Sequence, residues 1–222
     1  MYNQSYRKPQ QAYELDRNLD RFQEFAEGEH DYDAEVIDPK RYGKDINRYF
    51  YRPEPIVEFE RIEMEGTLFM FQGIDYLYTR PKIPVMSRRM LYVLNSVGTF
   101  PHQIITVSIK DNESSEYDIY KPSGKYNRHE YVAVQILENS DFFDYEKSEY
   151  RIDKNNPNRV KSIRQAVFKE PPEGFPPLFR IPEDKSGLYV SPQARAALEE
   201  ANITGINFID LTLDNYRWAT NN

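Results

Sequence analysis

The feature that most constrains the fold is a series of short apolar segments, divided by turn residues, that begins at Ile56. β-Branched and aromatic residues concentrate in segments 104–109, 131–136 and 206–211. Runs of this length are typical of strands, because a helix needs a longer stretch with apolar positions three and four residues apart. The proline-rich segment 171–177 cannot pair in a sheet, and it predicts a stiff stretch of surface. Strands therefore supply most of the predicted core.

Two segments carry the local signals of helices. Ser87 is a good N-cap for a helix that ends near Gly98. Ser191 followed by Pro192 begins a second helix, because strong helix formers fill residues 194–201. Two helices scattered among many strands are too few for a doubly wound parallel sheet. The predicted fold class is therefore α+β, with a mostly antiparallel sheet and a few flanking helices.

The first part of the 222-residue chain differs from the remainder in composition. Residues 1–54 are mostly polar, but one apolar stripe with spacings of three, four, three and four crosses them: Ala12, Leu15, Leu19, Phe22 and Ala26. This periodicity predicts an amphipathic helix over about residues 10–27. We expect residues 1–54 to form a polar N-terminal arm that carries this helix, and residues 55–222 to form the α+β domain.

Acidic residues outnumber basic ones, and the formal net charge is −7 with a pI near 5.2. Because nucleic-acid binding requires clustered Lys and Arg, the sequence predicts no nucleic-acid partner. The most one-sided charge run lies at residues 27–38, which contain six acids and no Lys or Arg. This run is either a solvated loop or an anionic contact patch for a basic protein. The 18 tyrosines suit such an interface as well as a half-buried sheet.

The sequence carries no sign of export or of membrane insertion. Met1 leads directly into polar residues, and no apolar run approaches the ~20 residues that span a bilayer. The chain also has no cysteine, which is compatible with a reducing compartment. We therefore expect a cytoplasmic protein that does not bind membranes.

Motifs for catalysis, cofactors and metals are missing from the sequence. The three histidines, His30, His102 and His129, never stand in pairs at the helical spacing of a zinc site. A metal site formed by His30, Asp31 and Asp33 is kept open as an alternative. No Gly-x-Ser-x-Gly elbow and no glycine-rich phosphate loop occurs. The sequence predicts a protein that is not an enzyme, with no catalytic residues, no metal and no cofactor.

Four features between Pro84 and Leu211 follow one another in a distinctive order. They are Ile83-Pro84 before a Ser87-capped helix with Leu91, the Tyr131–Ile136 strand followed by Asp141 or Asp144 with Ser148, the Leu178-Phe179-Arg180-Ile181 segment, and a closing Val190-Ser191 helix with Leu198-Glu199 that leads into Thr204-Gly205-Ile206-Asn207-Phe208. In these features the chain resembles a large family of bacterial polymorphic-toxin immunity proteins, the family numbered eleven. The first 54 residues carry no part of the resemblance.

The resemblance implies a cytoplasmic antidote that binds a cognate antibacterial toxin, encoded by the adjacent gene, and so protects the producing cell. No cofactor and no catalytic residue is implied. The expected contact residues are acidic and tyrosine side chains of two segments: Asp31, Tyr32, Asp33 and Glu35 in the first, and Asp141, Asp144, Tyr145 and Glu146 in the second.

Two other functions remain open at the level of sequence. A structural adaptor would assemble into large oligomers. A hydrolase with a dispersed site would combine carboxylates with a histidine, and the candidates are Glu58, Glu60, Glu138, Asp144, His102 and His129. The sequence defines neither the chemistry of the toxin nor the oligomeric state.

Overall fold

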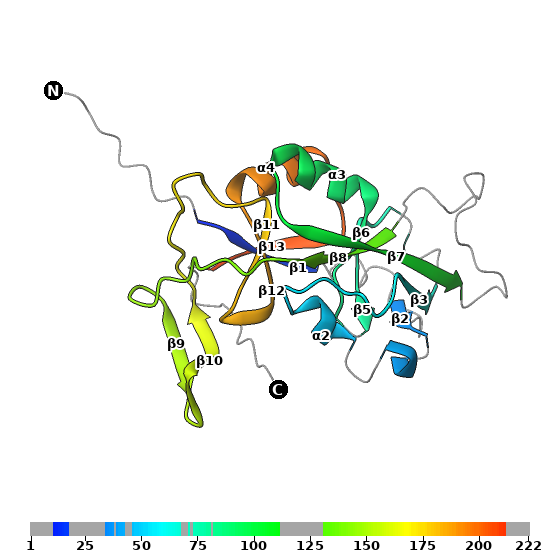
Figure 1. The fold of residues 1–222 in the computed structure, drawn as a ribbon. Coiled ribbons are helices and arrows are strands. Elements are labelled where there is room, and N and C mark those ends of the chain that lie inside the picture. The colour runs from blue at the N-terminus through cyan, green and yellow to red at the C-terminus, as the bar shows by residue number, and fades with distance from the viewer. Residues whose placement is uncertain are drawn as a thin grey trace, which may run out of the picture.

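The computed structural model describes residues 11–17, 34–37, 39–42, 46–67, 71, 73–80, 82–111 and 131–211. Within these ranges the strands form a large sheet, a smaller sheet and a two-stranded ribbon that extends away from both (Figure 1). Two helices pack side by side across the sheets. The predicted α+β class with mostly antiparallel strands is confirmed.

The large sheet has seven strands in the order β4-β6-β8-β7-β3-β2-β5. Its strands are β2 (Ala34–Val36), β3 (Arg61–Gly66), β4 (Tyr76–Leu77), β5 (Thr79–Arg80), β6 (Val85–Ser87), β7 (His102–Asp111) and β8 (Tyr131–Ile136). The pairings are antiparallel except for β3 with β7 and β2 with β5. The predicted strand at 131–136 is confirmed as β8, which lies between β6 and β7. Its residues are apolar almost throughout because both faces of the sheet are covered.

The smaller sheet has the order β11-β12-β1-β13, and all its pairings are antiparallel. Its strands are β1 (Tyr13–Arg17), β11 (Leu178–Ile181), β12 (Asp184–Val190) and β13 (Ile206–Asp210). The separate ribbon pairs β9 (Glu149–Asp153) with β10 (Asn156–Gln165). The smaller sheet therefore joins segments from both ends of the described chain.

The helices are η1 (Pro39–Tyr42), α2 (Asn47–Phe50), α3 (Arg88–Val97) and α4 (Pro192–Glu200). The two predicted helix starts are confirmed. Ser87 Oγ accepts a hydrogen bond from Met90 N at 3.0 Å, and Ser191 Oγ accepts one from Ala194 N at 3.1 Å. None of the helices in the described ranges has the length and apolarity of a membrane span.

The helix predicted over residues 10–27 is wrong where the structure describes it, because Tyr13–Arg17 is strand β1. This strand lies between β12 and β13, and it pairs with β13 from Tyr13 opposite Asp210 to Arg17 opposite Ile206. Ala12 and Leu15 are buried in two different core clusters. A spacing of three puts two residues on one face of a helix but on opposite faces of a strand, so the two partner strands decide the conformation. Leu19, Phe22 and Ala26 lie outside the described residues.

The described residues of the expected N-terminal arm belong to the sheets and the core. β1 is an inner strand of the smaller sheet, and β2 pairs with β3 in the large sheet. Tyr42, Ile46 and Phe50 are buried in the cluster that covers one face of the large sheet. On the opposite face, α3 and α4 pack over Val132 and Val134 together with side chains of the smaller sheet. This second cluster is thus shared by the two sheets, α3 and α4.

Candidate partner-binding surface

The first group of expected contact residues is described only at its end. Asp31, Tyr32 and Asp33 lie outside the described residues, as does His30 of the alternative metal site. Glu35 is exposed on β2, and its Oε1 lies 3.6 Å from Nη1 of Arg80 on the neighbouring strand β5. Both partners are largely exposed, so this ion pair contributes little to stability, and the Glu35 carboxylate faces solvent.

The second group lies in the connection between β8 and β9, where one member forms a turn. The Asp144 side chain accepts hydrogen bonds from the backbone N–H groups of Glu146, at 3.1 Å, and Lys147, at 3.3 Å. Only 5% of Asp144 is exposed, and Nζ of Lys147 lies 3.3 Å from its carboxylate. Burial opposes ionisation, but the Lys147 ammonium and the two N–H groups outweigh it and lower the pKa of Asp144. This carboxylate is used within the turn, and we leave Asp144 out of the proposed contact surface.

Tyr145 and its neighbours form a rigid exposed cluster on the same turn. The ring of Tyr145 packs edge-on against Phe143, at 4.9 Å between centroids, and against Tyr150, at 5.4 Å. Its hydroxyl donates a hydrogen bond to Glu183, which raises the pKa of Tyr145 to about 12. With 44% of Tyr145 exposed and Glu146 exposed beside it, the turn presents an aromatic ring with acidic groups around it. Such a preorganised tyrosine suits a protein interface.

A groove of about 780 Å³ lies beside this turn, between the end of α3, residues 138–142, residues 173–179 and the start of α4. Among the described residues that line it, the charged ones are all acidic and exposed: Glu138, Asp141 and Glu173. Phe142, Phe175 and Phe179 form its aromatic floor, with ring centroids 5.3 to 5.7 Å apart. We call this feature the acidic groove. Its shape and charge suit a basic segment of a protein partner.

Sequence reasoning found the acidic groove only in part. Asp141 was expected at a contact, and Glu138 was considered only as a hydrolase carboxylate. Glu173 was missed, although it lies in the segment 171–177 that was predicted to be stiff surface. Nothing local in the sequence indicates that β11 brings this segment beside residues 138–142, through a hydrogen bond of 2.8 Å from Ser140 N to Arg180 O.

The residues of the alternative hydrolase do not meet a histidine where the structure describes them: Glu58 and Glu60 line one pocket, but His102 does not line it. Glu58 is held by Arg52 at 2.8 Å, Glu138 lies in the acidic groove, and Asp144 lies in its turn. His102 stacks on Phe100, and its Nδ1 lies 2.8 Å from the Phe100 carbonyl oxygen. His129 lies outside the described residues. Within the described ranges, no three His, Asp or Glu side chains are grouped so that they could hold a metal ion.

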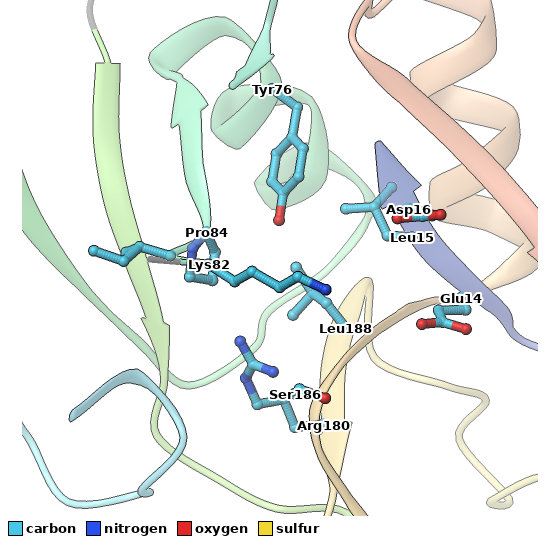
Figure 2. Close-up of a pocket in the computed structure, with 10 residues that line it drawn as sticks. Glu14, Leu15, Asp16, Tyr76, Lys82, Pro84, Arg180, Ser186 and Leu188 are labelled. Atoms are coloured by element: carbon cyan, nitrogen blue, oxygen red, sulfur yellow. The ribbon is translucent and has the colours of Figure 1, made fainter. Parts of the chain in front are cut away.

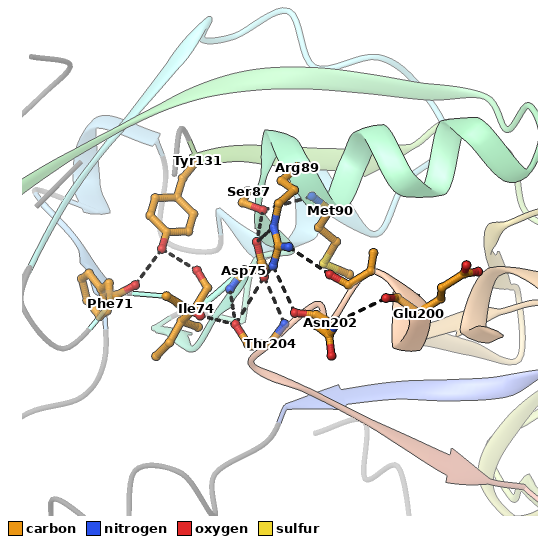
Figure 3. Close-up of polar contacts among 12 residues, drawn as sticks. Phe71, Ile74, Asp75, Ser87, Arg89, Met90, Tyr131, Glu200, Asn202 and Thr204 are labelled. Carbon is orange, nitrogen blue, oxygen red and sulfur yellow. Dashed lines mark hydrogen bonds and ion pairs between the residues drawn. The ribbon is translucent and has the colours of Figure 1, made fainter. Parts of the chain in front are cut away.

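One buried carboxylate does meet a serine, at the junction of the large sheet with α3 (Figure 3). Asp75 is fully buried, and its Oδ1 accepts hydrogen bonds from Ser87 Oγ at 2.6 Å and from Arg89 Nε at 3.1 Å. Its Oδ2 accepts from Thr204 N at 3.1 Å and from Arg89 Nη2. Burial opposes ionisation, but the Arg89 guanidinium, Ser87 and Thr204 outweigh it and lower the pKa of Asp75.

This arrangement connects separate elements of the fold. Ser87 Oγ already donates to Asp75 and accepts from the first turn of α3. Arg89 continues the network to the carbonyl groups of Ala201, at 3.0 Å, and Asn202, at 3.1 Å. The network therefore joins β4 and α3 to the connection between α4 and β13.

The adjoining glycine belongs to the same junction. Gly205 has a φ of +82°, and a Cβ at this position would lie 2.5 Å from the Tyr76 carbonyl oxygen. Only glycine adopts this conformation at so close an approach without strain. The Thr204-Gly205 pair of the family resemblance thus has a structural reason, because Thr204 binds Asp75 while Gly205 lets the two backbones meet.

Comparison with known proteins gives one family match. No curated protein matches the chain. The sequence model of the Immunity protein family (Imm11) matches residues 11–212. The match begins well before Pro84, so the expectation that the first 54 residues stand outside the resemblance is wrong from residue 11 onward. β1 explains this extent, because an inner strand is required to complete the smaller sheet. The chain therefore belongs to the immunity protein family Imm11.

Proposed function

We propose that this protein is a cytoplasmic antidote that neutralises a cognate antibacterial toxin by binding it, and that the toxin is encoded by the adjacent gene. Membership of an immunity family supports a protective, non-enzymatic role. The observation that carries the proposal is the acidic groove, in which three exposed carboxylates surround an aromatic floor. Aromatic rings in a groove supply buried contact area, and the acids at its edge select and steer a basic segment.

The proposed contact surface consists of the acidic groove and the turn beside it. Glu138, Asp141 and Glu173 provide the charge of the groove, and Tyr145 and Glu146 extend the surface along the turn. An interface of ordinary size, ~1,600 Å² in total, would need more area than the groove alone offers. Glu35, with Asp31, Tyr32 and Asp33, remains part of the proposal as a second acidic contact.

The first test is co-expression of the chain with the product of the adjacent gene. We expect that product to arrest growth when it is expressed alone, and the chain to restore growth and to copurify with it. A neighbour that is harmless, or that does not copurify with the chain, would refute the immunity role itself.

The second test reverses the charge of the acidic groove with Glu138→Lys, Asp141→Lys and Glu173→Lys together. We expect affinity for the toxin to fall about 100-fold, or roughly 2.7 kcal/mol, because lysines would face the basic segment. Isothermal titration calorimetry measures the loss of affinity. Repeated at a second salt concentration, it also measures the salt dependence of binding, which is expected to be weaker in the triple variant. The three side chains are exposed, so the melting temperature is expected to change little.

A matched control makes the same change of charge outside the groove. Glu54→Lys, Glu60→Lys and Glu200→Lys replace exposed acids that do not line it. We expect this control to retain binding within a few-fold. Equal losses in the two triple variants would show that net charge, and not the groove, governs binding.

A further inference from the structure

A second and smaller pocket lies between the two sheets, where β1 and β12 meet Tyr76 of β4 and the segment before β6 (Figure 2). Its volume is about 110 Å³. Pockets for metabolites usually enclose at least ~300 Å³, so this one is too small for such a ligand. At ~30 Å³ per water molecule it has room for three or four waters, or for a carboxylate group and the end of its side chain.

Arg180 of β11 places a guanidinium at this pocket, although only 2% of the residue is exposed. Its Nη1 donates hydrogen bonds to the carbonyl oxygens of Lys185, at 3.0 Å, and Gly187, at 2.7 Å. Its Cζ lies 5.4 Å from the centre of the Tyr51 ring. Nε is buried and has no hydrogen-bond partner among the residues that the structure describes. Figure 2 shows the guanidinium directed into the pocket.

Arg180 also lacks an anionic partner in the described part of the chain, since none of its carboxylates lies within ion-pair distance of this guanidinium. Asp184 lies on the next strand, but its oxygens accept from Ser186 N and Oγ, Gly187 N and Tyr189 Oη, at 2.9 to 3.3 Å. Burial lowers the pKa of Arg180, although the nearby Asp184 carboxylate opposes the shift. Removing a guanidinium from water is costly, and proteins usually offset the cost with a paired carboxylate.

Two further groups point into the same space. The side chain of Lys82 extends across the pocket, and the hydroxyl of Tyr76 is directed toward it (Figure 2). Two cations near each other are mutually unfavourable unless an anion lies between them. A guanidinium beside an ammonium and a phenol hydroxyl offers several donors to one carboxylate, and the planar fork of arginine matches that group.

The acids of β1 do not fill this role. Glu14 and Asp16 line the pocket on either side of Leu15, which is buried in the core. Both acids line the pocket, but neither carboxylate lies within ion-pair distance of Arg180 in the described part of the chain. Asp16 is exposed to solvent.

We propose that this Arg180 pocket binds one carboxylate group, presented by an Asp or Glu side chain of the protein partner. The proposal rests on the proposed function for the identity of the partner, but the existence of the site does not depend on it. The partner would then need an acidic side chain for the Arg180 pocket and a basic segment for the acidic groove. Such a pattern fixes the orientation of the partner and rejects proteins that carry only one of the two features.

Acetate tests the pocket without any partner. We expect sodium acetate, titrated at constant ionic strength against sodium chloride, to shift the Nε–Hε resonance of Arg180 in the ¹⁵N-labelled full chain, saturably and in the millimolar range. Acetate should also raise the melting temperature, because a ligand that binds only the folded state stabilises it. An Arg180 resonance that does not respond to acetate would overturn the proposal. So would tighter binding of inorganic phosphate than of acetate, because the pocket would then be a phosphate site.

Lys82→Glu tests the same pocket from its edge. Lys82 is exposed, so the change spares the core, and the new carboxylate would occupy the space beside Arg180. We expect it to abolish the acetate response and to weaken toxin binding at least about tenfold. Lys161→Glu on the exposed face of β10 carries the same change of charge and is expected to alter neither.

The two measurements separate the site from its occupant. A Lys82→Glu variant that still binds acetate like the wild-type chain would overturn the site. Acetate binding by the wild type together with unchanged toxin affinity in Lys82→Glu would show that the pocket serves a free carboxylate, and would overturn the assignment to the partner. Absence of any toxin for this chain would refute the proposed function alone, because the acetate titration would still report on the pocket.

Discussion

Replacing Gln135 with leucine is expected to destabilise the protein by about 3 kcal/mol, because one buried amide organises a whole irregular segment. Gln135 of β8 is fully buried. The two N–H groups of its Nε2 are shared among three carbonyl oxygens, those of Tyr49 and Arg52, both at 2.9 Å, and of Glu54, at 2.7 Å. Its Oε1 accepts from Ile56 N at 3.2 Å. Leucine has a similar volume but would leave these partly buried carbonyl oxygens without their amide donor, at roughly 1–3 kcal/mol for each that water cannot reach.

Gln103 provides the graded comparison for this prediction. It lies opposite Gln135 in the β7–β8 pairing and is only half-buried. Its side chain binds Ile56 alone, through Oε1 to N at 2.8 Å and Nε2 to O at 2.9 Å. Gln103→Leu is therefore expected to cost about 1–2 kcal/mol. Urea unfolding followed by circular dichroism measures the unfolding free energy of both variants. A loss for Gln135→Leu no larger than that for Gln103→Leu would contradict the role given to the Gln135 amide.

Asp75→Asn is expected to cost about 2–3 kcal/mol at pH 7, because it removes the carboxylate at the centre of the buried network. The amide NH₂ of asparagine would face Arg89 Nη2 or Thr204 N, which are both donors. The side chain of Arg89 is 44% exposed, so solvent screens part of the loss and the expected cost lies below that of a fully buried pair. Glu63→Gln removes the carboxylate paired with Arg41, whose side chain is 61% exposed, and is expected to cost less than ~0.5 kcal/mol.

The effect of Asp75→Asn on the free energy of unfolding is expected to depend on pH. The pKa of Asp75 is lowered in the folded protein from its ordinary value of 3.8. A lowered carboxyl pKa stabilises the fold above the unfolded value, and that contribution is lost as pH falls through the folded value. The difference in unfolding free energy between wild type and Asp75→Asn should therefore be largest at neutral pH and shrink below about pH 4. A difference that stays constant down to pH 3 would show that Asp75 acts through shape alone.

The sequence predicted correctly those features of the fold that depend on residues close together in the chain. Ser87 and Ser191 begin helices because a hydroxyl caps a backbone N–H only three residues away. The apolar run at Tyr131–Ile136 predicted an inner strand because a strand covered on both faces has no polar side. The same reasoning failed at Tyr13–Arg17, where an apolar spacing of three is compatible with a helix face and with a strand buried on both faces. The pairing of β1 with β12 and β13, whose partner residues lie 175 to 197 positions away, decides between the two.

The sequence by itself determined the α+β class, through its short apolar segments, and the resemblance to the immunity family, through the four features from Ile83 to Phe208. The tertiary structure alone decided which surface is available for binding. It buries Asp144 in a turn, and it adds Glu173 to Glu138 and Asp141 around one groove. Among the described residues it leaves Nε of the buried Arg180 without a hydrogen-bond partner. The reason is that burial and charge pairing depend on contacts between residues far apart in the chain, whereas capping and periodicity act within a few residues.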